Sequence, residues 1–182
     1  MSALPNEADS PAFRVRGQAV AFNSPTVIFT FDGIDYYEQI DPQAFAGCDM
    51  SDVIMNYDHG GMVVARTRNK TLSFDIDEKG LWPTAVLGGT AEGRNLYEAI
   101  AGGYVDRMSF QFVIAEDGEE YDPDAHMWTI KRIKKLYDVS AVSIPAYDQT
   151  SISARSADFE YRKKQMQEFE LRRKTLLVMS HL

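Results

Sequence analysis

Short segments in which polar and apolar residues alternate recur through residues 12–144 of this chain. Alternation with a period of two puts every second side chain on the same face of an extended backbone, so each segment predicts a half-buried β-strand. Turn-forming pieces such as DEKG at residues 77–80 separate them. So many short strands predict a mainly β fold and favour a closed or nearly closed β-barrel. The segments lie at residues 12–23, 27–31, 35–40, 52–55, 71–76, 81–87, 105–115, 128–133 and 136–144.

Two helices are expected beside these strands. Residues 90–101 begin with Thr90, which can cap the first turn, carry apolar residues on one face, and are followed by two glycines that can end the helix. A shorter helix is predicted at residues 42–46, where Pro42 suits the first turn and Asp41 can serve as its cap. The fold class expected from these elements is α+β, mainly β with surrounding helices.

A change of composition near residue 156 predicts a domain boundary. Residues 158–174 are rich in charged, helix-forming residues and contain no glycine or proline, so a charged helical C-terminal tail is predicted at residues 156–182. Its apolar residues are sparse, which leaves three roles open: docking on the preceding domain, binding a partner, or serving as a removable tail. Residues 13–155 are predicted to form a single β-barrel domain, after a flexible N-terminus at residues 1–12.

Composition narrows the partners and cofactors. With 27 acidic and 19 basic residues among 182, the net charge of -8 disfavours nucleic-acid binding, which needs many cationic contacts to phosphate. No apolar run approaches the roughly 20 residues that cross a bilayer, and no secretion signal is evident. We therefore expect no membrane partner and a cytoplasmic location. Cys48 is the single cysteine and no Cys/His cluster suggests zinc, so no disulfide, metal or cofactor is expected.

Three residues offer the chemistry of a hydrolase. A serine hydroxyl is a weak nucleophile until a neutral imidazole takes its proton, and the imidazole works best when an acceptor fixes its tautomer. His59, Ser109 and Asp138 are candidates for the base, the nucleophile and the acid. His126 lies in a polar turn and His181 is the penultimate residue, so His59, which precedes two glycines at a strand end, is the best-placed base.

Alternation also predicts the faces of the strands that carry Ser109 and Asp138. Ser109 is expected opposite the apolar side chains of Met108 and Phe110, so its hydroxyl points away from the main apolar layer. Asp138 and Ser140 are expected to share a strand face, opposite Tyr137, Val139 and Ala141. The plain structural interpretation of both residues is a solvated polar position on an outward strand face.

The identity of the acid is left open by the residues alone. His59 can be an ordinary surface-loop histidine, and Asp58 beside it competes with Asp138 for the acid role. Adjacent residues on an extended chain usually point apart, which favours the remote Asp138 unless a loop defeats that argument.

Three motifs in a fixed order carry a family resemblance: NYDHG at residues 56–60, RMSFQF at 107–112 after a helix that ends in two glycines, and LYDVSAVSIPAY at 136–147. With these motifs the chain resembles the tailed-phage prohead maturation proteases over about residues 13–155. The earlier stretches GQAVAFN at 17–23 and IDPQAF at 40–45 belong to the same resemblance. Each motif is weak alone, and the three in this order are fairly specific.

The resemblance implies a fold, an activity and a setting. Such proteases are similar in fold to the herpesvirus assemblins, which implies a β-barrel of the herpesvirus-protease type wrapped by helices. The resemblance implies a serine endopeptidase with His59 as base, Ser109 as nucleophile and Asp138 as third member, where relatives often carry glutamate. It implies cleavage of the scaffolding part of the major capsid protein, and autocleavage, inside the assembling prohead in the cytoplasm of a bacterial host. A homo-oligomer is plausible by the same likeness.

Two rival functions remain. The first is a catalytically silent capsid-assembly or scaffold-binding module with the same barrel, which the charged tail motivates. The second is a metal-dependent hydrolase that uses His59, Asp58 and another acid, although three scattered histidines provide no recognisable ligand spacing. Arg107 is disfavoured as an oxyanion donor because residues two apart on a strand are separated by roughly 6 to 7 Å.

Overall fold

The computed structural model describes residues 1–3, 13–144, 164 and 168, a part of the chain that contains thirteen strands and one α-helix. The chain divides into two units, Met1–Gln149 and Thr150–Leu182. The strands and the helix belong to the first unit, and of the second only Lys164 and Glu168 are described, both with helical backbone. Residues 4–12 of the predicted flexible N-terminus, the predicted boundary at residue 156 and the rest of the predicted tail lie outside the described residues.

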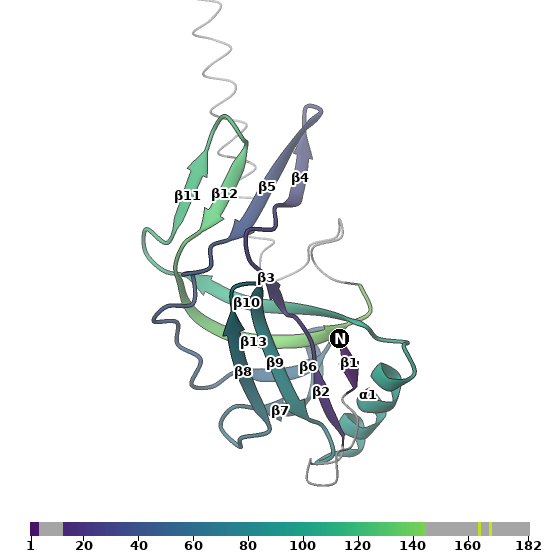
Figure 1. Ribbon diagram of the computed structural model, residues 1–182. Coiled ribbons are helices and arrows are strands. Elements are labelled where there is room, and N and C mark those ends of the chain that lie inside the picture. Colours follow the sequence, from purple (N-terminus) through teal and green to yellow (C-terminus); the bar gives the residue numbers. More distant parts are fainter. Residues whose placement is uncertain (4–12, 145–163, 165–167, 169–182) are drawn as a thin grey trace, which may run out of the picture. The chain divides into compact units, whose positions relative to one another are not determined.

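The strands form three sheets (Figure 1). The first contains β1 (Ser2–Ala3), β2 (Arg14–Arg16), β9 (Gly80–Val86) and β3 (Val20–Ala21) in that order, with β8 (Leu72–Asp77) also paired to β9. The second has the order β10 (Arg107–Ile114), β13 (Ile133–Val142), β6 (Ile54–Tyr57) and β7 (Gly60–Arg66). The third has the order β11 (Glu119–Asp122), β12 (Met127–Ile130), β5 (Ile34–Ile40) and β4 (Thr26–Phe31).

The sheet topology overturns the predicted barrel. In none of the three sheets are the first and last strands joined, so, within the described residues, no sheet closes into a barrel. The predicted closed or nearly closed β-barrel of the herpesvirus-protease type is therefore wrong. The described residues of the first unit are mostly β, with the single helix α1 in place of surrounding helices. Alternation locates strands but carries no information about which strands pair, and closure depends on that pairing.

The shorter predicted helix is also absent. Residues 42–47 form consecutive turns, held by bonds from the N–H of Ala44, Ala46 and Cys48 to the carbonyl three residues earlier. Asp41 Oδ1 accepts a hydrogen bond from the Gln43 N–H at 2.7 Å, as a turn-forming aspartate does. Gly47, with φ +82°, then adopts a left-handed conformation that breaks any helix. The segment is too short to accumulate the bonds that stabilise an α-helix.

The longer predicted helix is confirmed as α1 (Ala91–Ala101). The Thr90 side chain accepts a bond from the Gly93 N–H at 2.9 Å, and Gly102 is the C-cap. Leu96 and Ile100 are buried on one face, and the helix contacts β1 and β7. The described part of the chain contains no helix with the length and hydrophobicity needed to span a membrane.

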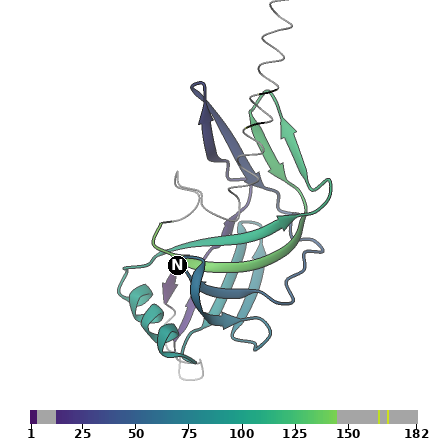
Figure 2. The ribbon, with the colours of Figure 1, turned by 180° about the vertical axis from the view of Figure 1, so that it is seen from behind.

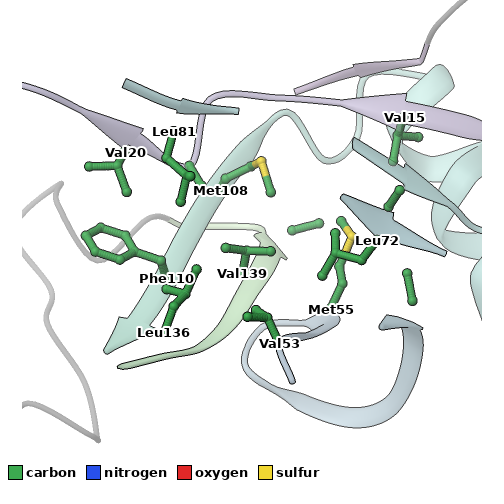
Figure 3. Close-up of a cluster of buried hydrophobic side chains, with 14 of the residues drawn as sticks. Val15, Val20, Val53, Met55, Leu72, Leu81, Met108, Phe110, Leu136 and Val139 are labelled. Carbon is green, nitrogen blue, oxygen red and sulfur yellow. The ribbon is translucent and has the colours of Figure 1, made fainter. Parts of the chain in front are cut away.

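The hydrophobic core lies between the first and second sheets and fixes the orientation of β10 and β13. Figure 3 shows side chains from the first sheet, among them Val20 and Leu81, meeting Met108 and Phe110 of β10. Gly17 lies so close that a Cβ there would sit 2.7 Å from the Met108 sulfur. In Figure 2 β10 and β13 run as two long strands beside one another. Because one face of this pair is committed to the core, its other face is left for polar side chains.

The third sheet has a cluster of its own, made of aromatic rings. Phe29 and Tyr36 stack with centroids 4.7 Å apart, and Tyr121 and Trp128 lie 4.4 Å apart. The parallel pairing of β12 with β5 brings these rings from two hairpins onto one sheet.

Candidate active site

Ser109 lies on the face of β10 that turns away from the hydrophobic core. In the antiparallel β10–β13 ladder, Ser109 is the direct partner of Ser140, and Phe110 is the partner of Val139. Directly paired residues project from the same face, so Phe110 and Val139 enter the core while Ser109 and Ser140 share the opposite face. Alternation therefore places Ser109 correctly. The plain interpretation of Ser109 as a solvated position is wrong, because only 2% of the residue is exposed.

A β-bulge at Tyr137 sets the face on which Asp138 lies. Gln111 pairs with Asp138 and Phe112 with Leu136, so Tyr137 is an extra residue without a partner in the register. The bulge allows Leu136 and Val139, three residues apart, both to enter the core, while Tyr137 is 48% exposed. The prediction that Tyr137 shares the face opposite Asp138 is thus wrong, because a bulge interrupts the period of two.

A tight turn brings His59 to Asp138. Asp58 and His59 both have positive φ, +48° and +56°, between the end of β6 and the start of β7. Strand β6 runs parallel to β13, with Ile54 opposite Asp138. The turn reverses the chain, and His59 Nδ1 lies 3.0 Å from each oxygen of the Asp138 carboxylate.

The contact with Asp138 fixes the tautomer of His59. A carboxylate only accepts hydrogen bonds, so the proton of the neutral ring must be on Nδ1, and Nε2 carries a free lone pair. The His59 side chain is 17% exposed, against 5% for Asp138, so the ring is the accessible member of the pair. A ring in this state can accept a proton from a third group at Nε2.

Asp58 makes different contacts from Asp138. Its carboxylate accepts hydrogen bonds from the Ser143 N–H at 2.9 Å and from the Ser143 hydroxyl at 3.0 Å. Its own N–H donates to the Ala141 carbonyl at 3.0 Å. Of the two candidate acids, Asp138 is the one that contacts the ring, and Asp58 ties the turn to the end of β13.

Ser109 is brought to the same face as the His59–Asp138 pair without being bonded to it. Ser109 is the partner of Ser140, and Asp138 lies two residues along the strand, a diagonal separation of roughly 7 to 8 Å between Cα atoms. In the part of the chain that the structure describes, no hydrogen bond joins the Ser109 hydroxyl to His59. The register thus places Ser109 near the pair, and catalytic hydrogen bonds are often formed only when substrate is bound.

Two further polar residues at the site were missed from the sequence. The Ser140 hydroxyl lies 2.9 Å from Asp138 Oδ1 and also makes a hydrogen bond with the Asn56 side chain. Both residues belong to the motifs that surround His59 and Asp138, and Ser140 was expected to share a strand face with Asp138. That shared face was the available signal, whereas the approach of Asn56 depends on the pairing of β6 with β13.

A charged contact anchors β13 just before the bulge. Asp49 lies 3.2 Å from the Lys135 ammonium and accepts hydrogen bonds from the N–H and hydroxyl of Ser51 at 3.0 and 2.6 Å. These hydrogen bonds, with help from Lys135, lower the pKa of the Asp49 carboxyl to about 2. The backbone of Asp49 also bonds to Lys134 and Leu136, so the loop holds both sides of Lys135.

The site contains no evident metal centre. No group of three or more His, Cys, Asp or Glu side chains that could hold an ion occurs among the described residues. Cys48 is half-buried, and that burial raises the pKa of its thiol.

Comparison with known proteins bears on most of the chain. Residues 3–165 match the model of a protein family described as Caudovirus prohead serine protease. Comparison with curated proteins gave no match, and comparison with solved structures gave none either.

Proposed function

Because this chain belongs to the caudovirus prohead serine protease family, we propose that it is a serine endopeptidase with His59, Ser109 and Asp138 as its catalytic residues. The observation that carries the proposal is the contact of His59 Nδ1 with both Asp138 oxygens. That contact supplies an oriented base on the strand face that Ser109 shares. A serine protease that works through a catalytic triad needs its nucleophile, its base and its acid in one place.

The proposed reaction is acyl transfer to Ser109. The Ser109 oxygen attacks the scissile carbonyl carbon while its proton moves to His59 Nε2, and a C–O bond forms. The C–N bond then breaks as His59 gives that proton to the leaving amine. Water then gives a proton to His59 and its oxygen attacks the ester carbon. The C–O bond to Ser109 breaks as His59 returns that proton to the Ser109 oxygen, which releases the acid. Asp138 remains ionised and stabilises the imidazolium through Nδ1.

Hydrogen bonding favours Ser109 over its neighbours as the nucleophile. The Ser140 hydroxyl contacts Asp138 and Asn56, and the Ser143 hydroxyl contacts Asp58. A hydroxyl whose proton is already donated to a carboxylate has no proton to give to His59 Nε2. The Ser109 hydroxyl has no such commitment to a described carboxylate, which supports it as the group that His59 deprotonates.

The family description also supports a setting for the reaction. We propose that the substrate is the scaffolding part of the major capsid protein, that the enzyme cleaves itself as well, and that both events occur inside the assembling prohead in the cytoplasm of the bacterial host. Self-association is part of this proposal. A relationship to the herpesvirus assemblins stays a prediction.

Co-expression with the neighbouring capsid gene tests this function. Mass analysis of the capsid protein should show new termini with the wild-type chain and none with Ser109→Ala. Intact capsid protein with both chains would favour the silent assembly module, whereas processing that survives Ser109→Ala would remove Ser109 as the nucleophile. Processing that a chelator abolishes and a divalent metal restores would favour the metal-dependent alternative.

A further inference from the structure

A small group of polar side chains is buried behind the His59–Asp138 pair. Asn56 is 5% exposed, Asp138 is 3% exposed and Ser140 is fully buried. Asn56 comes from β6 and the other two from β13, and the parallel pairing of these strands brings them together. Burying polar groups is unfavourable unless each one finds a hydrogen-bond partner, so the contacts within this group determine whether it is stable.

The single proton of the Ser140 hydroxyl gives this group a direction. Ser140 Oγ lies 2.9 Å from Asp138 Oδ1 and also contacts the side-chain oxygen position of Asn56. One hydroxyl donates only one hydrogen bond, and a bond to a carboxylate is about twice as strong as one to a neutral amide. The proton therefore goes to Asp138.

The lone pairs of Ser140 then require a donor from Asn56. When Ser140 donates to Asp138, an amide oxygen facing Ser140 Oγ would leave two acceptors in contact at a buried position. A half-turn of the Asn56 amide replaces that oxygen with the NH2 group at no cost in shape. All contacts then have one donor and one acceptor.

We propose that Asn56 and Ser140 are positioning residues that hold the Asp138 carboxylate for His59. The chain of hydrogen bonds runs from Asn56 Nδ2–H to Ser140 Oγ, and from Ser140 Oγ–H to Asp138 Oδ1, which also receives His59 Nδ1–H. Oδ1 thus has two donors, which restrict rotation of the carboxylate and so keep the imidazole oriented toward Ser109. This inference rests on the proposed function, because positioning matters only if His59 serves as a base.

Reaction with a fluorophosphonate probe tests the proposal on the full-length chain. Ser140→Ala should lower the maximal labelling rate of Ser109 by up to about 100-fold, the scale on which misplacement of a catalytic group acts. The probe concentration at half-maximal rate should stay unchanged, because neither residue contacts the probe. Ser73→Ala, the same substitution at an exposed position of β8, is the matched control and should leave both values unchanged.

Asn56→Asp tests the direction of the hydrogen bonds, in which Asn56 donates to Ser140. Aspartate has nearly the same shape as asparagine but no NH2 donor, so the variant should lose labelling rate as Ser140→Ala does. In a Ser140→Ala background the Asn56→Asp substitution should add little, because Asn56 acts through Ser140. Full additivity of the two effects would contradict the proposed chain of hydrogen bonds.

A spectroscopic readout separates positioning from general loss of structure. The downfield NMR resonance of His59 Nδ1–H should shift in Ser140→Ala and stay fixed in Ser73→Ala. In the wild-type chain itself, the Asn56 NH2 protons should give nuclear Overhauser contacts to the Ser140 β protons. This measurement needs no folded variant at either position. The absence of these contacts would overturn the proposed chain of hydrogen bonds.

The results of these experiments distinguish the positioning role from the proposed protease function on which it rests. A wild-type chain that neither processes capsid protein nor takes up the probe during assembly would overturn both. A wild-type chain that is active, beside a Ser140→Ala variant with the wild-type labelling rate and an unshifted His59 resonance, would overturn the positioning role alone.

Discussion

Around Ser109 and Ser140 both faces of the β10–β13 ladder are buried, and they are stabilised in different ways. On the core face, Phe110, Leu136 and Val139 gain stability by leaving water. On the opposite face, Asp138 and Ser140 are as deeply buried, and their burial is tolerated only because each has a hydrogen-bond partner. The comparison teaches that substitutions on one face should act on folding and those on the other on chemistry.

The largest expected effect belongs to the polar face. Ser109→Ala removes the proposed nucleophile and should lower kcat by about a million-fold, as in other serine proteases. Its free energy of unfolding should change by less than about 1 kcal/mol, because the hydroxyl gives up no hydrogen bond to His59. Capsid processing and denaturant unfolding measure the two quantities. A large loss of stability without loss of processing would mean that Ser109 serves folding and not chemistry.

Asp138→Asn should have the next largest effect. An asparagine that turns its NH2 toward His59 favours the wrong tautomer, and kcat should fall by about 10,000-fold. Asp58→Asn is the control, since Asp58 contacts Ser143 in place of the ring, and it should keep most of the activity. If Asp58→Asn proves the more damaging of the two, the acid has been assigned to the wrong residue.

The core face should respond in the opposite sense. Leu136→Ala removes a fully buried side chain and should cost about 2 to 5 kcal/mol of unfolding free energy. The folded fraction should keep its labelling rate with a fluorophosphonate. Tyr137→Ala, one residue away on the bulge and half exposed, should cost much less. Equal losses from the two substitutions would mean that the bulge does not separate core from surface.

The smallest effect is expected at the contact between Asp49 and Lys135, which lies outside the site and the core. The pKa of Asp49 is lowered from 3.8 to about 2, so its contribution to stability is present above pH 3.8 and is lost as the pH falls through about 2. Asp49→Asn should lower the Tm slightly at pH 7, and the gap from wild type should close as the pH falls from about 4 to about 2. Thermal unfolding across that range measures it, and a gap independent of pH would rule out the ionised form as its source.

Sequence patterns predicted α1 and most of the strands, but they missed β1, β7 and β11. The face of Ser109 followed from alternation in β10 because the ladder stays in register from Arg107 to Gln111. The helix α1 followed from its cap, its apolar face and its glycines, all of which are local signals.

Most of the errors arose where structure depends on pairing between distant segments. The bulge at Tyr137 and the open sheets are properties of strand register, which alternation does not contain. Asn56 was missed for the same reason, since it meets Ser140 only because β6 lies parallel to β13. The turns at residues 42–47 replaced a helix because a short segment with a left-handed glycine cannot sustain one.

Mapping the adduct of a fluorophosphonate by mass spectrometry, on the chain assembled with its capsid protein, tests the central claim most directly. The arrangement of His59 and Asp138 beside β10 predicts one modified residue, Ser109, and its disappearance in His59→Ala. An adduct on Ser140 or another serine, or labelling of Ser109 that persists in His59→Ala, would contradict it.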